Sequence, residues 1–183
     1  METKIIKIDQ DNLDHKLMQE AGDLIAAGEL VAFPTETVYG LGGDALDPEA
    51  SKKIYSAKGR PSDNPLIVHI SDFSDLERIA KTVPEDARKL SDAFWPGPLT
   101  MIFKKTDRVP MATTGGLPTV AVRMPSNKIA AALIRAAGGY IAAPSANRSG
   151  RPSPTVAKYV IEDLDGRVEM AQVSALSEVL FCS

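Results

Sequence analysis

The sequence predicts a single α/β domain with a mixed sheet flanked by helices. Segments with helical spacing alternate with short apolar runs along the chain, which is the order typical of layered α/β folds. The length of 183 residues suits one domain better than two. With 44% hydrophobic and 25% charged residues, the composition is that of a soluble globular protein with a packed core.

The first half of the chain shows helix and strand signals in turn. Helical spacing of leucine, alanine and isoleucine, followed by a glycine, predicts a helix over 13–27. The run "ELVAFPTE" predicts a short strand that ends at Pro34. Asp47 and Pro48 are a typical N-cap and first-turn pair for a helix through Ala57. The next strand is expected in "PLIVHI".

The second half of the chain continues this alternation. Its expected strands are short apolar runs, and proline or glycine ends several of the expected elements. The polar stretches "FPTETVYGLGGD", "TTGGLP" and "SANRSGRPSP" are expected to be loops. The remaining expected elements are helices over 74–79, 84–94, 127–137 and 155–161 and strands over 99–104, 119–124 and 140–144.

Charge and cysteine content narrow the classes of function. The formal net charge of −3 argues against nucleic acid as the main electrostatic partner, although a local basic cleft stays open. The single cysteine, Cys182, excludes an internal disulfide or a cysteine-based zinc cluster, so a reducing, cytoplasmic setting is expected. The N-terminus lacks a signal-like apolar region, and no run approaches the ~18 apolar residues of a membrane helix.

Four polar loops at strand ends are where a ligand site is expected: "FPTETVYGLGGD", "KGRPSDNP", "TTGGLPTVAVR" and "APSANRSGRPSP". They contain neither a phosphate-binding P-loop, nor a dinucleotide fingerprint, nor the serine-hydrolase motif G-x-S-x-G. With two histidines and no acidic partner at ligand spacing, no protein-built metal site is expected. Hydroxyls, glycines and a few cations remain, which suit binding of phosphate and carboxylate.

The cations in these loops have structural interpretations as well. Lys58 and Arg60 lie at the expected end of a helix, where the macrodipole favours cations. On spacing alone, this structural role and an anion-binding role are equally well supported. Asn64 before a proline also fits a turn, and His69 in a strand fits a structural role. Arg123 lies on an apolar strand, so burial would require a carboxylate from the protein or from a ligand.

The hydroxyl-bearing residues are equally open to two interpretations. Thr35 and Thr37, which flank a glutamate, fit closure of a local turn at a strand end as well as ligand binding. Ser145 and Asn147 fit a turn that Gly150 completes.

Five segments in order resemble the YrdC-like threonylcarbamoyl-AMP synthases: "PTETVYGLG", "KGRPSDNPLIVHI", "WPGPLT", "TVAVRMP" and "APSANRSGRPSPT". The resemblance runs from about Gly28 to about Val168 and implies a twisted, open sheet with a concave, positively charged cleft. It also implies an enzyme that makes L-threonylcarbamoyl-AMP from L-threonine, bicarbonate and ATP, with release of pyrophosphate. The product would serve threonylcarbamoyl modification of tRNA by downstream transferase proteins, and Mg²⁺ would accompany the ATP phosphates.

The family pattern also implies roles for matching positions. Lys58 and Arg60 would act in catalysis with Mg²⁺ by neutralising charge. The threonine would be surrounded by Thr37, His69, Arg123 and the backbone around Ala143. ATP would face Lys58, Arg60, Asn64, Thr119, Ser145 and Ser153, with Asn147 in support.

The C-terminal part departs from the family pattern. After "DLDGRVEM" the family continues with a glycine-rich segment and a strand carrying Glu-Ser-Thr, whereas this chain reads "AQVSALSEVLFCS". We therefore expect a YrdC-like domain over 1–170, a divergent or truncated tail over 171–183, and weak or no synthase activity from this chain alone. Two alternatives stay open: a module that binds tRNA or ribosomal RNA, and a relative that forms a carbamoyl adenylate without threonine.

Overall fold

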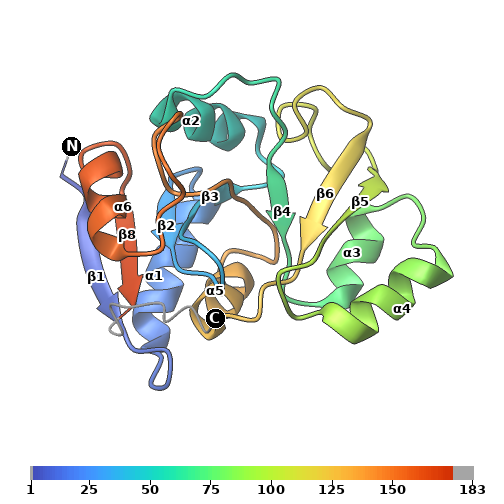
Figure 1. Ribbon diagram of the computed structural model, residues 1–183, viewed down its shortest axis with the longest axis horizontal. Helices are drawn as coiled ribbons and strands as arrows, with labels where there is room; N and C mark the ends of the chain where they lie inside the picture. Colours follow the sequence, from blue (N-terminus) through green and yellow to red (C-terminus); the bar gives the residue numbers. More distant parts are fainter. Residues whose placement is uncertain (1, 175–183) are drawn as a thin grey trace.

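The computed structural model describes residues 2–174, which form an eight-stranded sheet with helices on both faces (Figure 1). Parallel and antiparallel pairs occur together in the order β1-β8-β2-β3-β7-β4-β6-β5, which confirms the predicted mixed-sheet α/β class. The strands are β1 (Lys4–Ile8), β2 (Val31–Phe33), β3 (Gly40–Asp44), β4 (Ile67–His69), β5 (Thr100–Lys104), β6 (Thr119–Arg123), β7 (Ile141–Ala142) and β8 (Met170–Ser174). The helices are α1 (His15–Ala26), α2 (Pro48–Lys58), α3 (Phe73–Ile79), α4 (Glu85–Phe94), α5 (Lys128–Ala136) and α6 (Ala157–Leu164).

The apolar core has two parts, one on each face of the sheet. Successive strand residues point to opposite faces, so Ile141 joins one cluster and Ala142 the other. Helices α1 and α5 pack together over the first face, and α2, α3 and α6 contribute to the second. The close approach of α1 to α5 requires Gly22, because a Cβ there would lie 2.6 Å from the carbonyl carbon of Ala136.

The helices predicted from spacing and caps are all present within about three residues of their expected ends. Asp47 caps α2 by accepting a hydrogen bond from the N–H of Glu49 at 2.8 Å. Asn127 caps α5 in the same way, through the N–H groups of Ile129 and Ala130. Across residues 2–174, no helix combines the length and the apolar character needed to cross a bilayer.

The prediction of a loop over "YGLGGD" is wrong, because Gly40–Asp44 forms β3 inside the sheet. Glycine has low strand propensity, so this segment gives no strand signal. Neighbouring side chains fill the space that β3 leaves open. A Cβ on Gly42 would lie 2.8 Å from side-chain atoms of both Phe33 and Ile141.

Strands β1 and β8 have no counterpart among the predicted elements. They come from opposite ends of the described chain and pair in parallel, with Ile6 beside Gln172. Strand β8 also pairs with β2, so it lies inside the sheet. The expected domain boundary at residue 170 therefore falls at the start of a strand that continues to Ser174. The rest of the expected tail, residues 175–183, lies outside the described residues.

Candidate functional site

Two of the four predicted loops are joined by backbone hydrogen bonds. The loop after β2 and the loop after β7 exchange bonds from the N–H of Tyr39 to the carbonyl of Pro154 (2.8 Å) and from the N–H of Ala146 to the carbonyl of Tyr39 (2.7 Å). The Thr35 hydroxyl closes a turn by donating to the carbonyl of Val38 at 2.6 Å and accepting from its N–H. Thr35 thus has the local structural role that the sequence left open.

Arg123 at the end of β6 reaches the loop after β2. Its Nη2 donates to Glu36 Oε1 at 2.7 Å and to Thr37 Oγ1 at 3.0 Å. The arginine is 9% exposed, so the requirement for an anionic partner is met by a carboxylate of the protein. Sequence reasoning missed Glu36 as a site residue, although it lies inside the motif "PTETVYGLG" beside Thr37.

The Glu36–Arg123 pair is only partly satisfied. Glu36 Oε2 and Arg123 Nε are buried and make no hydrogen bond of ordinary geometry within residues 2–174. Burial acts to raise the pKa of Glu36, but the hydrogen bond from Arg123 and nearby backbone N–H groups of Glu36 and Ser126 hold it below its ordinary value. Glu36 is therefore a carboxylate at neutral pH, with one oxygen not yet used.

His69 lies beside Arg123 in the parallel pair of β4 and β6. It is 4% exposed, and burial, reinforced by the charge of Arg123, lowers its pKa to about 4. Its Nδ1 lies 3.2 Å from the carbonyl oxygen of Ile67, which also accepts from the N–H of Ala143 at 2.9 Å. The four residues assigned to threonine, Thr37, His69, Arg123 and Ala143, are thus connected through these contacts.

Lys58 ends α2 but does not extend into solvent. Its side chain is buried, and Nζ donates to the carbonyls of Ser145 and Asn147 in the loop after β7. Burial and the nearby charge of Arg60 lower the pKa of Lys58 to about 8, so it remains mostly protonated at neutral pH. The helix-end interpretation explains where Lys58 lies in the sequence, whereas its burial and contacts show that it also holds the second loop.

Asn147 acts as an internal brace of this loop. Its Nδ2 donates to the carbonyls of Arg148 (2.9 Å) and Arg151 (2.6 Å), and its Oδ1 lies 3.5 Å from Lys58 Nζ. Asp163 on α6 adds an ion pair with Arg151 and accepts from the N–H of Arg148. These contacts hold the loop together, and a supporting role of Asn147 toward ATP stays a prediction.

The segment "KGRPSDNP" packs against the loop before β6. The N–H of Leu66 bonds to the carbonyl of Thr113 at 3.0 Å, and a Cβ on Gly115 would lie 2.8 Å from the carbonyl oxygen of Asp63. Arg60 is half-buried, and its Nε is buried without a hydrogen-bond partner in the described part of the chain. A second cation thus carries an unused donor in this region.

Three residues assigned to ATP are less tightly tied to the others. Asn64 is exposed in the loop before β4, and Ser153 is exposed between β7 and α6. Thr119 begins β6, opposite Lys104. For residues 2–174, the side-chain hydrogen bonds of Lys58 go to Ser145 and Asn147 and not to Thr119 or Ser153, so a shared ATP surface stays a prediction.

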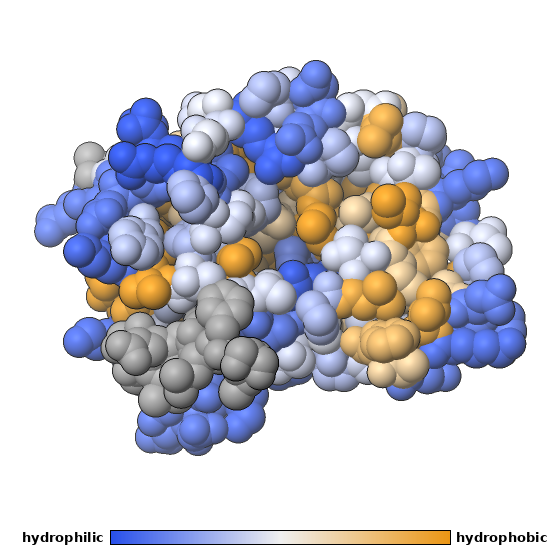
Figure 2. Space-filling model, in the orientation of Figure 1, coloured by the Kyte–Doolittle hydropathy of each residue, from blue (hydrophilic) through white to orange (hydrophobic). Residues whose placement is uncertain are grey.

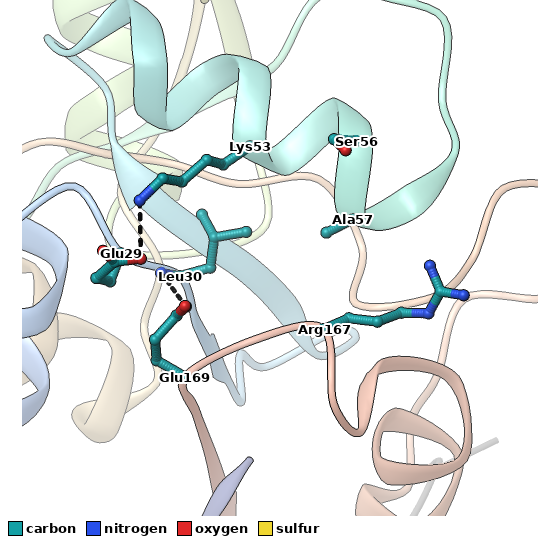
Figure 3. A pocket seen from close by; sticks show the side chains of 7 residues that line it. All are labelled: Glu29, Leu30, Lys53, Ser56, Ala57, Arg167 and Glu169. Carbon is teal, nitrogen blue, oxygen red and sulfur yellow. Dashed lines mark hydrogen bonds and ion pairs between the residues drawn. The ribbon is translucent and has the colours of Figure 1, made fainter. Parts of the chain in front are cut away.

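The space-filling view shows a hollow near the middle of one face (Figure 2). A different cavity, of about 450 Å³, lies between α2, the start of β2 and the segment before β8 (Figure 3). It contains the ion pair of Lys53 with Glu29 at 2.8 Å, and Glu169 accepts from the N–H of Leu30. None of the predicted site residues lines this second cavity. Among the described residues, no group of three His, Cys, Asp or Glu side chains is placed to hold a metal ion.

The chain is similar in sequence to threonylcarbamoyl-AMP synthases. It is 55% identical over 167 residues to that of Pyrococcus abyssi, covering 91% of this chain and 49% of the relative. It is 58% identical over 150 residues to that of Bacillus subtilis, covering 81% and 43%. The chain thus spans about half the length of these curated relatives.

Structure comparison and a family model agree with this similarity. The crystal structure of P. abyssi Sua5 complexed with L-threonine superposes with a TM-score of 0.92 and 52% identity, over 94% of this chain and 50% of that one. The Sua5/YciO/YrdC family model, described as telomere recombination, matches residues 23–174. These matches confirm the resemblance that the five motifs carry, and the chain belongs to the Sua5/YciO/YrdC family.

Proposed function

We propose that this chain forms L-threonylcarbamoyl-AMP from L-threonine, bicarbonate and ATP, and releases pyrophosphate. The observation that carries the proposal is the cluster of Arg123, Thr37 and His69 in a fold that superposes on Sua5 complexed with L-threonine. Because the chain spans about half the length of the curated relatives it matches, the complete reaction is assigned here as a proposal. The activity is that of a nucleotidyltransferase.

The proposed threonine side of the site binds by charge and shape. The Nε–H of Arg123 has no partner in the described chain and would donate to the substrate carboxylate. Buried, neutral His69 adds no second positive charge beside Arg123. The site would thus present a single guanidinium to a single carboxylate.

The proposed ATP side acts by neutralising charge. Bicarbonate supplies carbon dioxide by dehydration, and the threonine ammonium loses a proton to become a free amine. The amine captures carbon dioxide as a carbamate with release of a further proton, and a carbamate oxygen then attacks the α-phosphorus while pyrophosphate leaves. Both reacting groups are anionic, so Lys58 and Arg60 would lower the barrier by aligning them and offsetting their repulsion. Mg²⁺ would arrive with ATP and supply further charge neutralisation at the phosphates, with the nucleotide as its main ligand.

The product would be used by tRNA-modifying transferases, and a cytoplasmic location fits such a role. RNA binding as the main role is not favoured, because the net charge is −3 and the similar relatives carry the synthase name. A carbamoyl-adenylate former that ignores threonine is less favoured because the fold superposes on a structure complexed with L-threonine.

Pyrophosphate release with ATP, Mg²⁺ and bicarbonate, with and without L-threonine, tests the proposal. Release is expected to depend on threonine and to fall strongly in Arg123→Gln. The matched control is Arg135→Gln, because Arg135 is an exposed arginine on α5. Release that is equal without threonine, or a chain that neither releases pyrophosphate nor binds threonine in calorimetry, would overturn the proposal.

A further inference from the structure

The ion pair of Glu36 with Arg123 leaves one donor and one acceptor unused. The Glu36 and Arg123 side chains are 20% and 11% exposed, and their contact measures 2.7 Å. Within residues 2–174, Glu36 Oε2 and Arg123 Nε are buried and make no hydrogen bond of ordinary geometry, although backbone N–H groups of Glu36 and Ser126 lie near the carboxylate. Ionised groups rarely stay buried with an unsatisfied atom, because desolvation is costly. The two unpaired atoms therefore indicate where a polar ligand binds.

The contacts of Arg123 show which atoms remain for that ligand. Both hydrogens of Nη2 are directed to protein acceptors, one to Glu36 Oε1 and one to Thr37 Oγ1. Glu36 therefore fixes the plane of the guanidinium and leaves Nε–H available. A carboxylate ligand would use this buried donor, because Nη2 is already occupied by the ion pair and by Thr37.

The unused atoms of the pair match the two charged groups of an α-amino acid. Glu36 keeps its pKa below the ordinary value, so Oε2 carries negative charge and accepts from a cation. Arg123 Nε–H donates to an anion. Neutral His69 contributes no charge, so the pair is neutral overall and suits a zwitterion.

We propose that Glu36 determines specificity by binding the ammonium group of the amino-acid substrate through Oε2, while Arg123 binds the carboxylate. The proposal rests on the proposed function and deepens it. It implies that the site selects zwitterionic amino acids over hydroxy acids, which lack the ammonium, and over amino alcohols, which lack the carboxylate. A glutamate that only orients Arg123 would make no such distinction.

Binding of two ligands to three proteins tests the role of Glu36. The ligands are L-threonine and its analogue with a hydroxyl in place of the α-ammonium. Isothermal titration calorimetry compares the wild type with Glu36→Gln, whose amide oxygen still accepts from Arg123 but carries no charge. The control is Glu29→Gln, a glutamate paired with Lys53 in the separate cavity of Figure 3.

The expected result is selective. Glu36→Gln weakens threonine binding at least ~10-fold, the scale of one lost charge-assisted hydrogen bond, and leaves the hydroxy analogue unchanged or tighter. Glu29→Gln binds both ligands as the wild type does. If Glu36→Gln weakens the binding of both ligands equally, or leaves threonine binding unchanged, the proposed role of Glu36 is overturned while the proposed function stands. Wild-type protein that binds no threonine overturns the proposed function and this proposal with it. Thermal unfolding of Glu36→Gln checks that the variant is folded.

Discussion

Acid sensitivity that arises from His69 is a direct consequence of its burial. His69 is 4% exposed, and burial lowers its pKa from 6.5 to about 4. Above pH 6.5 the ring is neutral in both the folded and the unfolded chain and adds no pH dependence. Between 6.5 and about 4 the unfolded chain binds a proton that the folded chain does not. The free energy of unfolding therefore falls as the pH falls through this interval.

The size of this effect follows from the shift. A difference of about 2.5 pH units corresponds to about 3 kcal/mol of unfolding free energy lost by about pH 4. His69→Asn removes the titrating ring and keeps an amide N–H near the position of Nδ1. Carboxylates contribute equally in both proteins, so the difference between wild type and variant isolates the histidine.

Urea unfolding at several pH values between about 7.5 and about 4 measures this difference. The stability advantage of the wild type over His69→Asn is expected to shrink by about 3 kcal/mol across the interval. His15→Asn is the matched control for loss of a histidine, because His15 is exposed at the start of α1. Parallel stability curves for wild type and His69→Asn would refute the reasoning.

Three further predictions concern the cations of the site and the core. Arg60→Ala should lower threonine-dependent pyrophosphate release at least ~10-fold, the loss of about 1.4 kcal/mol, and near-normal turnover would contradict the ATP assignment. Because the pKa of Lys58 is about 8, activity should decline as the pH rises above 8, and Lys58→Arg should move that decline to higher pH; an unmoved decline would exclude Lys58 as its cause. Gln172 is fully buried in β8, and among residues 2–174 both of its amide atoms are unpaired, so Gln172→Met should raise the unfolding free energy by about 1 to 2 kcal/mol in urea titrations; a loss of stability would show that the amide is needed.

The elements that the sequence predicted correctly are those with local signals. Asp47 and Asn127 mark helix starts, because their side chains accept hydrogen bonds from backbone N–H groups two or three residues further along the chain. The alternation of helices and strands likewise reflects patterns within short windows. These signals do not depend on how distant segments meet.

The missed elements depend on distant partners. Strand β3 consists largely of glycine, and the side chains of Phe33 and Ile141 from other strands occupy the space beside Gly42. Strands β1 and β8 are stabilised by pairing between the two ends of the described chain. Low strand propensity therefore explains why β3 was missed, whereas the isoleucines of β1 favour a strand that the sequence analysis did not assign.

The candidate site shows the same division. The need of Arg123 for an anionic partner was predictable from one charge on an apolar strand. Its partner Glu36 lies in another loop, and only the fold brings the two together. Lys58 lies at a helix end and is also buried. The sequence could not show the burial, because the carbonyls that Lys58 contacts lie in the loop after β7.

Threonine-dependent formation of the adenylate is the central claim. The most direct measurement is mass spectrometry of the reaction with ATP, Mg²⁺ and isotopically labelled bicarbonate, with and without L-threonine. Threonylcarbamoyl-AMP that carries the label is expected, at any yield, only when threonine is present. A labelled adenylate that forms equally without threonine, or no adenylate from a chain that also fails to bind threonine, would contradict it.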